Sequence, residues 1–220
     1  MRIIAGEWGG RPIRTPKGKG TRPTADRVRE AWMSAMGPSI PGARVLDLFA
    51  GSGALGLECL SRGAREVVFV ERARSALRAL RANIEELGAQ DRCRVVVGDA
   101  LTLAGSLDPG AFELAVADPP YDSGDAGRLV ELFRRRPFAG QLWVEHGNRD
   151  PIAKSGGGRT RTYGDTALTT LDAPDWEGPT PVPVDPEEAP LDSTGPGQDP
   201  PRPGAELDSP HADLPHDESP

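Results

Sequence analysis

Short apolar segments alternate with stretches of helical periodicity through the middle of the chain, and this alternation constrains the fold more than any other feature. Strands that are apolar on both faces and alternate with helices are typical of a parallel sheet covered on both sides. The expected strands are Arg44–Ala50, Glu66–Glu71, Arg94–Gly98, Phe112–Asp118 and Gln141–Glu145, and the expected helices are Gly53–Arg62, Ala73–Leu87, Leu101–Leu107 and Gly127–Arg136.

Two further segments extend this sheet. Arg159–Tyr163 and Ala167–Leu171 flank the turn residues Gly164 and Asp165, so they are expected to form a closing antiparallel hairpin. The sequence therefore predicts an α/β, Rossmann-like fold with a mixed seven-stranded sheet and helices on both faces.

The net charge of −7 is the sum of two unlike parts. Residues 173–220 hold twelve acidic residues, one arginine and 13 of the 23 prolines. A segment this poor in apolar side chains buries too little surface to offset its ordering entropy, so we expect a disordered acidic tail. Residues 1–172 hold 25 basic and 21 acidic residues, and this balance does not exclude a nucleic-acid partner.

The first 30 residues concentrate the positive charge, with eight Lys or Arg against three Asp or Glu. Residues 2–15 are expected to form a short hairpin with a glycine turn, and a helix is expected to begin at Pro23 and Thr24. We therefore divide the chain into a basic arm at 1–41, one domain at 42–172 and the tail at 173–220.

Several other classes of protein are disfavoured. The chain has no run of 18 apolar residues and no N-terminal apolar segment of signal-peptide length. Cys59 and Cys93 lie far apart without a neighbouring His or second Cys, which is typical of free cytosolic thiols. We expect a cytoplasmic protein, monomeric, with no membrane span and no bound metal.

A glycine-rich turn follows the first expected strand. Gly51, Gly53 and Gly56 match G-x-G-x-x-G, a pattern that lets a ligand approach the backbone at the mouth of such a sheet. Glu71 ends the second strand, where a carboxylate accepts hydrogen bonds from two ribose hydroxyls. Together they favour a nucleoside-containing cofactor over a tight turn that binds nothing.

Two more carboxylates narrow the choice of cofactor. Asp47 lies inside the apolar first strand, where it suits a ligand with a cationic amino group, such as the methionine moiety of S-adenosylmethionine. A buried structural carboxylate is the alternative interpretation. Asp99 follows the third strand, and it either accepts from an adenine amino group or caps the next helix.

The strongest signal is Asp118-Pro119-Pro120-Tyr121 at the end of the fourth strand. Two prolines remove two N–H donors and end the ladder, which leaves the Pro119 carbonyl in the crevice where such sheets bind ligands. This carbonyl and the Asp118 carboxylate can hold the two hydrogens of an –NH2 group and turn its lone pair toward a methyl donor. Tyr121 can stack on the nucleobase that carries this amino group.

With these motifs, the chain resembles the class I S-adenosylmethionine-dependent methyltransferases that methylate amino groups. More narrowly, it resembles the RsmD family, the 16S rRNA (guanine 966-N2)-methyltransferases. The resemblance covers residues 1 to about 172. It is carried by Arg2–Gly6 with Gly10-Arg11, by Arg22–Ala31, by Asp47–Gly56 with Ser61–Ala64, by Asp118–Tyr121 and by Tyr163–Thr166.

The resemblance implies roles for individual residues. Asp118, Pro119, Pro120 and Tyr121 would hold the target guanine. Arg11, Arg22, Thr24 and Arg27 would contact the RNA, and Arg22–Arg29 would lie across the mouth of the site. The expected contacts of S-adenosylmethionine are Asp47, Phe49, Ala50, Gly51, Gly53, Glu71 at the ribose, Arg72, Asp99 at the adenine, and Ala100. The expected partner is 16S rRNA within a small-subunit assembly particle.

Two alternatives remain open at this point. The Asp118 motif reads an –NH2 group and not a particular base, so adenine N6 in DNA or another rRNA guanine would also fit. A non-catalytic RNA-binding assembly factor could have retained the fold. The complete glycine turn, Glu71 and the Asp118 motif argue against it, because a protein that only binds RNA needs none of them.

Overall fold

The computed structural model describes residues 1–16, 23–121, 123–150, 152 and 158–178, with side chains omitted for 23–27. Most of the expected acidic tail, from residue 179 onward, lies outside the described residues, as does Arg22. Within the described ranges, no helix is long and apolar enough to cross a membrane.

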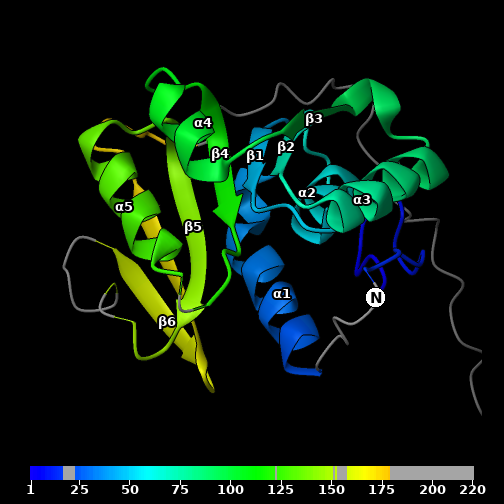
Figure 1. The fold of residues 1–220 in the computed structure, drawn as a ribbon, viewed down its shortest axis with the longest axis horizontal. Helices are drawn as coiled ribbons and strands as arrows, with labels where there is room; N and C mark the ends of the chain where they lie inside the picture. The colour runs from blue at the N-terminus through cyan, green and yellow to red at the C-terminus, as the bar shows by residue number, and fades with distance from the viewer. Residues whose placement is uncertain (17–22, 122, 151, 153–157, 179–220) are drawn as a thin grey trace, which may run out of the picture. The chain divides into compact units, whose positions relative to one another are not determined.

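Seven strands form one mixed sheet in the order β3-β2-β1-β4-β5-β7-β6 (Figure 1). The first five in this order are parallel to one another, and β7 runs antiparallel to both β5 and β6. This confirms the predicted seven-stranded mixed sheet. The strands are β1 (Arg44–Leu48), β2 (Glu66–Glu71), β3 (Cys93–Val97), β4 (Phe112–Ala117), β5 (Ala139–Gly147), β6 (Arg159–Tyr163) and β7 (Thr166–Asp172).

Helices cover both faces of the sheet. Side chains of α1 (Pro23–Met36), α2 (Ala54–Ser61) and α3 (Arg74–Leu87) share one apolar cluster with Val45. Side chains of α4 (Ala100–Ser106) and α5 (Asp125–Arg135) share the other with Leu46, and Figure 1 shows these two helices together. Successive residues of β1 therefore enter opposite clusters, as the strand period requires. Short 3-10 turns occur at Gly37–Ser39 and Gln90–Arg92.

The N-terminal segment forms the predicted hairpin in a short form, in which Ile3 donates to the carbonyl of Arg11 and Gly10 donates to the carbonyl of Ile3, both at 2.9 Å. Residues 2–15 double back, but they contain only one isolated antiparallel bridge, between Arg2 and Pro12. The ladder stops because Pro12 has no N–H to donate and because the N–H groups of Ile4 and Ala5 are used elsewhere. Both donate to the carboxylate of Glu58 on α2, at 2.7 and 3.1 Å.

Glu58 and Ser61 fasten this arm to α2. The Glu58 side chain is fully buried and also pairs with Arg62 at 2.8 Å. The Ser61 hydroxyl accepts from the N–H of Trp8 at 3.0 Å, and a Cβ on Gly6 would lie 1.8 Å from the Ser61 carbonyl oxygen. The arm is therefore held by buried hydrogen bonds at close range.

The packed structure continues beyond the predicted boundary at residue 172. Ala173 donates a backbone hydrogen bond to the carbonyl of Gly140 at 2.8 Å. The indole of Trp176 covers Gly140 so closely that an added Cβ would lie 2.2 Å from the ring. The single aromatic residue of the expected tail therefore packs on the start of β5.

Replacing Glu58 by Ala should destabilise the fold. Two backbone N–H groups would lose their acceptor, and we expect the free energy of unfolding to fall by about 2–4 kcal/mol. Urea denaturation measures this. Glu131→Ala is the control, because Glu131 is exposed and its ion pair with Arg135 is long, at 3.8 Å. This substitution should change the free energy of unfolding by less than about 0.5 kcal/mol. Equal effects of the two substitutions would contradict the anchoring role.

Candidate active site

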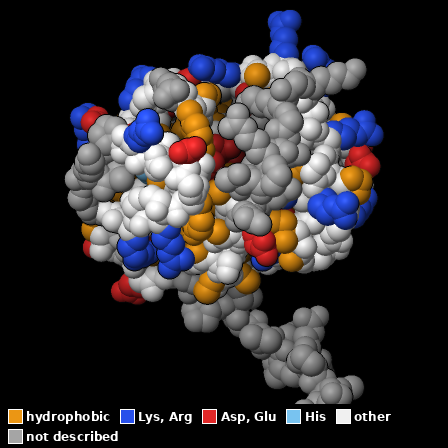
Figure 2. Space-filling view, turned by 90° about the horizontal axis from the view of Figure 1, so that it is seen from below, with side chains coloured by type: hydrophobic (Ala, Val, Ile, Leu, Met, Phe, Trp, Pro, Cys, Tyr) orange, Lys and Arg blue, Asp and Glu red, His pale blue; other side chains and the backbone are white. Residues whose placement is uncertain are grey.

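Four carboxylates lie at the same edge of the sheet. Glu71 ends β2, Asp118 follows β4, and Asp47 and Glu145 lie near the ends of β1 and β5. Each lies two residues after a side chain of the α1–α2–α3 cluster, so all four are on that face of the sheet. Figure 2 looks onto the side toward which β4 points and shows acidic side chains near its centre, with Lys and Arg around the rim.

The glycine turn after β1 uses its glycines in different ways. Gly51 and Gly53 adopt the left-handed region, with φ of 58° and 83°. A Cβ on Gly51 would meet nothing nearer than 3.9 Å, so the backbone there is open to a ligand. A Cβ on Gly53 would lie 2.5 Å from Leu80, and one on Gly56 would lie 2.4 Å from Phe69. These two glycines therefore serve close packing as well as the turn.

Glu71 bridges the glycine turn and the start of α3. Its carboxylate accepts from the N–H of Gly51 at 2.8 Å and from the N–H groups of Arg72 and Ala73 at 2.8 and 2.7 Å. A carboxylate offers about four acceptor positions, so one remains for a ligand hydroxyl. The neighbouring Phe49 adopts a φ of 63°, which is uncommon for a residue other than glycine.

Asp47 lies beneath the turn, and only 1% of its surface is exposed. It accepts from the N–H of Gly56 at 2.9 Å, which ties β1 to the start of α2. Its pKa is raised to about 8, mainly by burial, with smaller contributions from the nearby charges of Asp118 and Glu71. The structural role that the sequence left open for Asp47 is therefore present, and the buried carboxyl lies beneath the glycine turn.

Asp99 caps α4. Its carboxylate accepts from the N–H of Thr102 at 2.9 Å and pairs with Arg72 at 3.1 Å. The hydrogen bond from Thr102 holds its pKa below the usual range, and the Arg72 charge adds to this effect. Ala100 begins α4 and is buried, as is Ala50 in the glycine turn. The helix cap, one of two roles considered for Asp99, is therefore present.

The Asp118 motif begins where the β4 ladder ends, at Ala117. Asp118 is exposed, Pro119 is buried and Pro120 is exposed. Tyr121 is 46% exposed, and its hydroxyl donates to Glu145 at 2.7 Å and lies 2.9 Å from the hydroxyl of Thr166. The ring is thus held at its far end and keeps an accessible surface.

Glu145 also lies at this acidic edge, and the sequence alone did not identify it as a candidate. Ala117 pairs with Val144, so Asp118 and Glu145 are neighbours on adjacent parallel strands. Burial raises the Glu145 pKa to about 7, and the Asp118 charge contributes. The signal that could have revealed it is an acidic residue at the end of β5, but the sequence alone does not show that β5 lies beside the Asp118 motif.

The basic residues of the arm are distributed differently from expectation. Arg11 donates to the backbone carbonyl of Glu86 on α3. Arg29 is 6% exposed and donates to the carbonyl of Arg2 at 2.8 Å, so it fastens the arm and is not open to a ligand. Thr24 and Arg27 lie in α1, but their side chains, like all of Arg22, lie outside the described residues.

The edge described above fits a nucleoside with a cationic group. The backbone at Gly51 is open, Glu71 has acceptor capacity, and two further carboxylates lie on the same face. A ligand lying there would pass from Asp99 over the glycine turn toward Asp118. These features match the chemistry of S-adenosylmethionine, whose adenosine and amino acid parts carry hydroxyl and ammonium donors.

Comparisons with known proteins identify relatives over most of the chain. The family described as Conserved hypothetical protein 95 matches residues 1–170. YlbH of Bacillus subtilis is 34% identical over 178 residues, which are 76% of this chain and 96% of that protein. Ribosomal RNA small subunit methyltransferase D of Escherichia coli is 42% identical over 134 residues, 60% of this chain and 66% of that protein.

Solved structures agree with these relatives. The YhhF protein of Escherichia coli superposes with a TM-score of 0.67 at 32% identity, covering 77% of this chain and 96% of that one. A Thermus thermophilus 16S rRNA N2 G1207 methyltransferase in complex with AdoMet and guanosine shares the fold, with a TM-score of 0.56 at 23% identity, over 71% of this chain and 44% of that one.

The raised pKa of Glu145 predicts a pH dependence of stability. A folded-state pKa near 7, above the 4.5 of an exposed Glu, means that the folded protein binds this proton more tightly than the unfolded chain. The resulting stability is complete below the unfolded pKa and is lost as pH rises through the folded pKa. Wild type should therefore lose stability relative to Glu145→Gln between about pH 5 and about pH 8.

Urea denaturation of both proteins across this range measures the difference. Asp47 also has a raised pKa, but it is present in both proteins, and its contribution cancels in the comparison. A difference between wild type and Glu145→Gln that stays constant with pH would contradict the assignment.

Proposed function

We propose that this chain, which belongs to the RsmD family of methyltransferases, transfers a methyl group from S-adenosylmethionine to an amino group of 16S rRNA. The specific target proposed is the exocyclic N2 of guanine 966, within a small-subunit assembly particle. Residues 42–172 form the transferring domain, and residues 1–41 form an arm for cofactor and RNA. The protein acts as a monomer in the cytoplasm.

The observation that carries the proposal is the position of Asp118. It follows β4 at the edge where the glycine turn and Glu71 lie, on the same face of the sheet. The motif supplies two fixed acceptors, the Asp118 carboxylate and the Pro119 carbonyl, and two acceptors match the two hydrogens of an –NH2 group. The order of groups along the edge therefore supports a site in which an amine lies opposite a methyl donor.

The chain contributes orientation and charge to the reaction. A nucleobase amine is a poor nucleophile because its lone pair is delocalised into the ring. Two hydrogen bonds that hold its N–H groups turn the lone pair out of conjugation and toward the methyl group. Positive charge develops on the nitrogen as the N–C bond forms, and the Asp118 carboxylate stabilises it. The sulfonium of the cofactor supplies an electrophilic methyl group, whose bond to sulfur breaks as the bond to nitrogen forms, and the nitrogen releases one of its protons.

Tyr121 and its partners complete the base site. Hydrogen bonds to Glu145 and Thr166 fix the phenol, so its ring can pack on a base without first being ordered. Single-stranded or looped RNA provides such a base at low energetic cost, because an unpaired base needs little unstacking. An enclosed base held by Asp118 and Tyr121 is therefore consistent with an RNA substrate.

The proposal is tested by Asp118→Ala. We expect methyl transfer to small-subunit rRNA to fall by at least about 100-fold, because the amine loses its orienting acceptor. The affinity for S-adenosylmethionine, measured by calorimetry, should stay within about threefold, since the glycine turn and Glu71 are intact. Mass analysis of digested rRNA, free and in 30S particles, identifies the methylated nucleoside and its position.

Asp125→Ala is the matched control, because Asp125 follows the same loop, at the start of α5, and pairs with Arg128 at 3.2 Å. It should transfer methyl groups at the wild-type rate. Normal turnover by Asp118→Ala, or a methyl group found on a base other than guanine, would contradict the proposal.

A further inference from the structure

The face of the sheet that carries Asp118 continues across three strands. In the strand register, Glu145 of β5 pairs with Leu168 of β7, and Leu168 pairs with Arg161 of β6. Side chains of paired residues lie on the same face of a sheet. Arg161 therefore lies in the same row as Glu145, two strands away and on the face where Asp118 lies.

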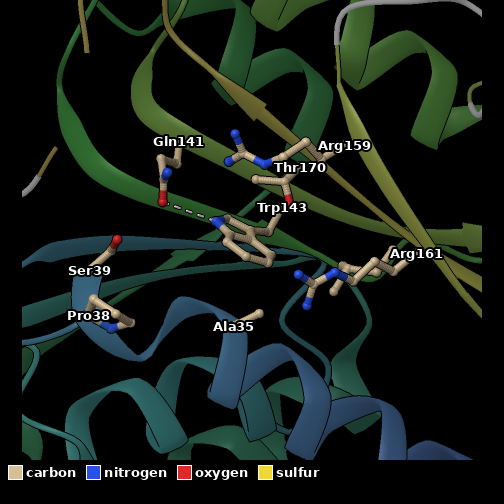
Figure 3. Close-up of a pocket in the computed structure, with 9 residues that line it drawn as sticks. Ala35, Pro38, Ser39, Gln141, Trp143, Arg159, Arg161 and Thr170 are labelled. Atoms are coloured by element: carbon tan, nitrogen blue, oxygen red, sulfur yellow. Dashed lines mark hydrogen bonds between the residues drawn. The ribbon is translucent and has the colours of Figure 1, made fainter. Parts of the chain in front are cut away.

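A pocket of about 200 Å³ opens one step along the strands from that row. Its floor includes Trp143 of β5 and Thr170 of β7, which pair with each other, and Arg159 of β6 pairs with Thr170. The end of α1 and Ser39 form the facing wall. Figure 3 shows the guanidinium group of Arg161 extending over the pocket toward Trp143 and α1.

The charge in this pocket is positive. None of the described residues that line it is acidic, and the charge of Arg159 is compensated by Asp172 at 2.9 Å. Arg161 is exposed, and within the part of the chain that the structure describes it forms no hydrogen bond or ion pair. The pocket thus presents a guanidinium group with all its donors available to a ligand.

The remaining lining selects an anion over an apolar ligand. Trp143 is only 7% exposed, so its ring offers little surface for stacking. Ser39 and Thr170 add hydroxyl groups, which can donate hydrogen bonds beside the guanidinium. Among common biological anions, phosphates and carboxylates have oxygens that match the several donors of a planar guanidinium best.

We propose that Arg161 and this pocket bind a backbone phosphate of the same RNA strand whose base lies at Asp118; this inference rests on the proposed function. Arg161 lies in the row of Glu145, and β6 lies three strand spacings, about 14 Å, from β4, which Asp118 follows. A strand that places one base at Asp118 therefore passes within reach of Arg161. The pocket fixes the register of the RNA relative to the reacting base.

Arg161→Ala tests this inference with an RNA oligonucleotide that the wild type methylates. We expect the RNA dissociation constant to rise about tenfold, because one charge-assisted contact is lost. The slope of log affinity against log salt should fall by about 0.7, the value for one phosphate contact on a single strand. The kcat at saturating RNA and the affinity for S-adenosylmethionine should stay at wild-type values.

Two further variants make the result specific. Arg161→Lys retains the charge and should restore the salt slope but only part of the affinity. Arg94→Ala removes an exposed arginine from β3, the opposite edge strand, and should leave RNA binding unchanged.

Wild-type affinity and salt slope in Arg161→Ala, with methylation intact, would overturn the inference and leave the proposed function standing. Equal losses in Arg94→Ala and Arg161→Ala would also overturn it, since they would reflect total charge. An acidic peptide that binds the wild type more tightly than the RNA does, and depends on Arg161, would reassign the pocket to a protein partner. If the wild type methylates no RNA, the proposed function itself fails.

Discussion

The ends of four parallel strands at one edge of the sheet determine where every group of the proposed site lies. Parallel strands bring their carboxyl ends together, and the alternation of side chains decides which face each residue joins. Asp47, Glu71, Asp118 and Glu145 come from four different strands, yet they lie on one face because each is in phase with the α1–α2–α3 cluster. The hydrogen bond from Gly56 to Asp47 then ties this edge to α2. A shift of one residue in any of these strands would move its carboxylate to the α4–α5 face.

The concentration of acidic groups at this edge explains its electrostatics. Burial together with neighbouring carboxylates raises the pKa of Asp47 to about 8 and that of Glu145 to about 7. Such groups are costly to ionise alone, and a cation placed among them lowers this cost. The positive charge of a sulfonium and the charge that develops on an amine during methyl transfer both meet this condition. Phosphates need the opposite potential, and the exposed guanidinium of Arg161 supplies it on the same face, away from the carboxylates.

Much of this arrangement could be predicted from the sequence, because it depends on local patterns. Apolar segments, the glycine turn and the two prolines after Asp118 indicate strands, a turn and a ladder end without further information, and the sheet follows. What the sequence could not provide depends on contacts between distant segments. The N-terminal hairpin stays short because Glu58 accepts the N–H groups of Ile4 and Ala5, and Glu145 joins the acidic edge only because β5 lies beside β4. Likewise, Arg161 reads as a surface arginine until the order β5-β7-β6 places it on the face of Asp118.

A crystal structure with S-adenosylhomocysteine, the product of methyl transfer, tests the central claim most directly. We predict that a ribose hydroxyl lies within hydrogen-bond distance of Glu71, that the adenosyl group passes over Gly51, and that the sulfur faces Asp118 on the α1–α2–α3 side of the sheet. A ligand bound on the α4–α5 face, or at the edge formed by the amino ends of the strands, would contradict it.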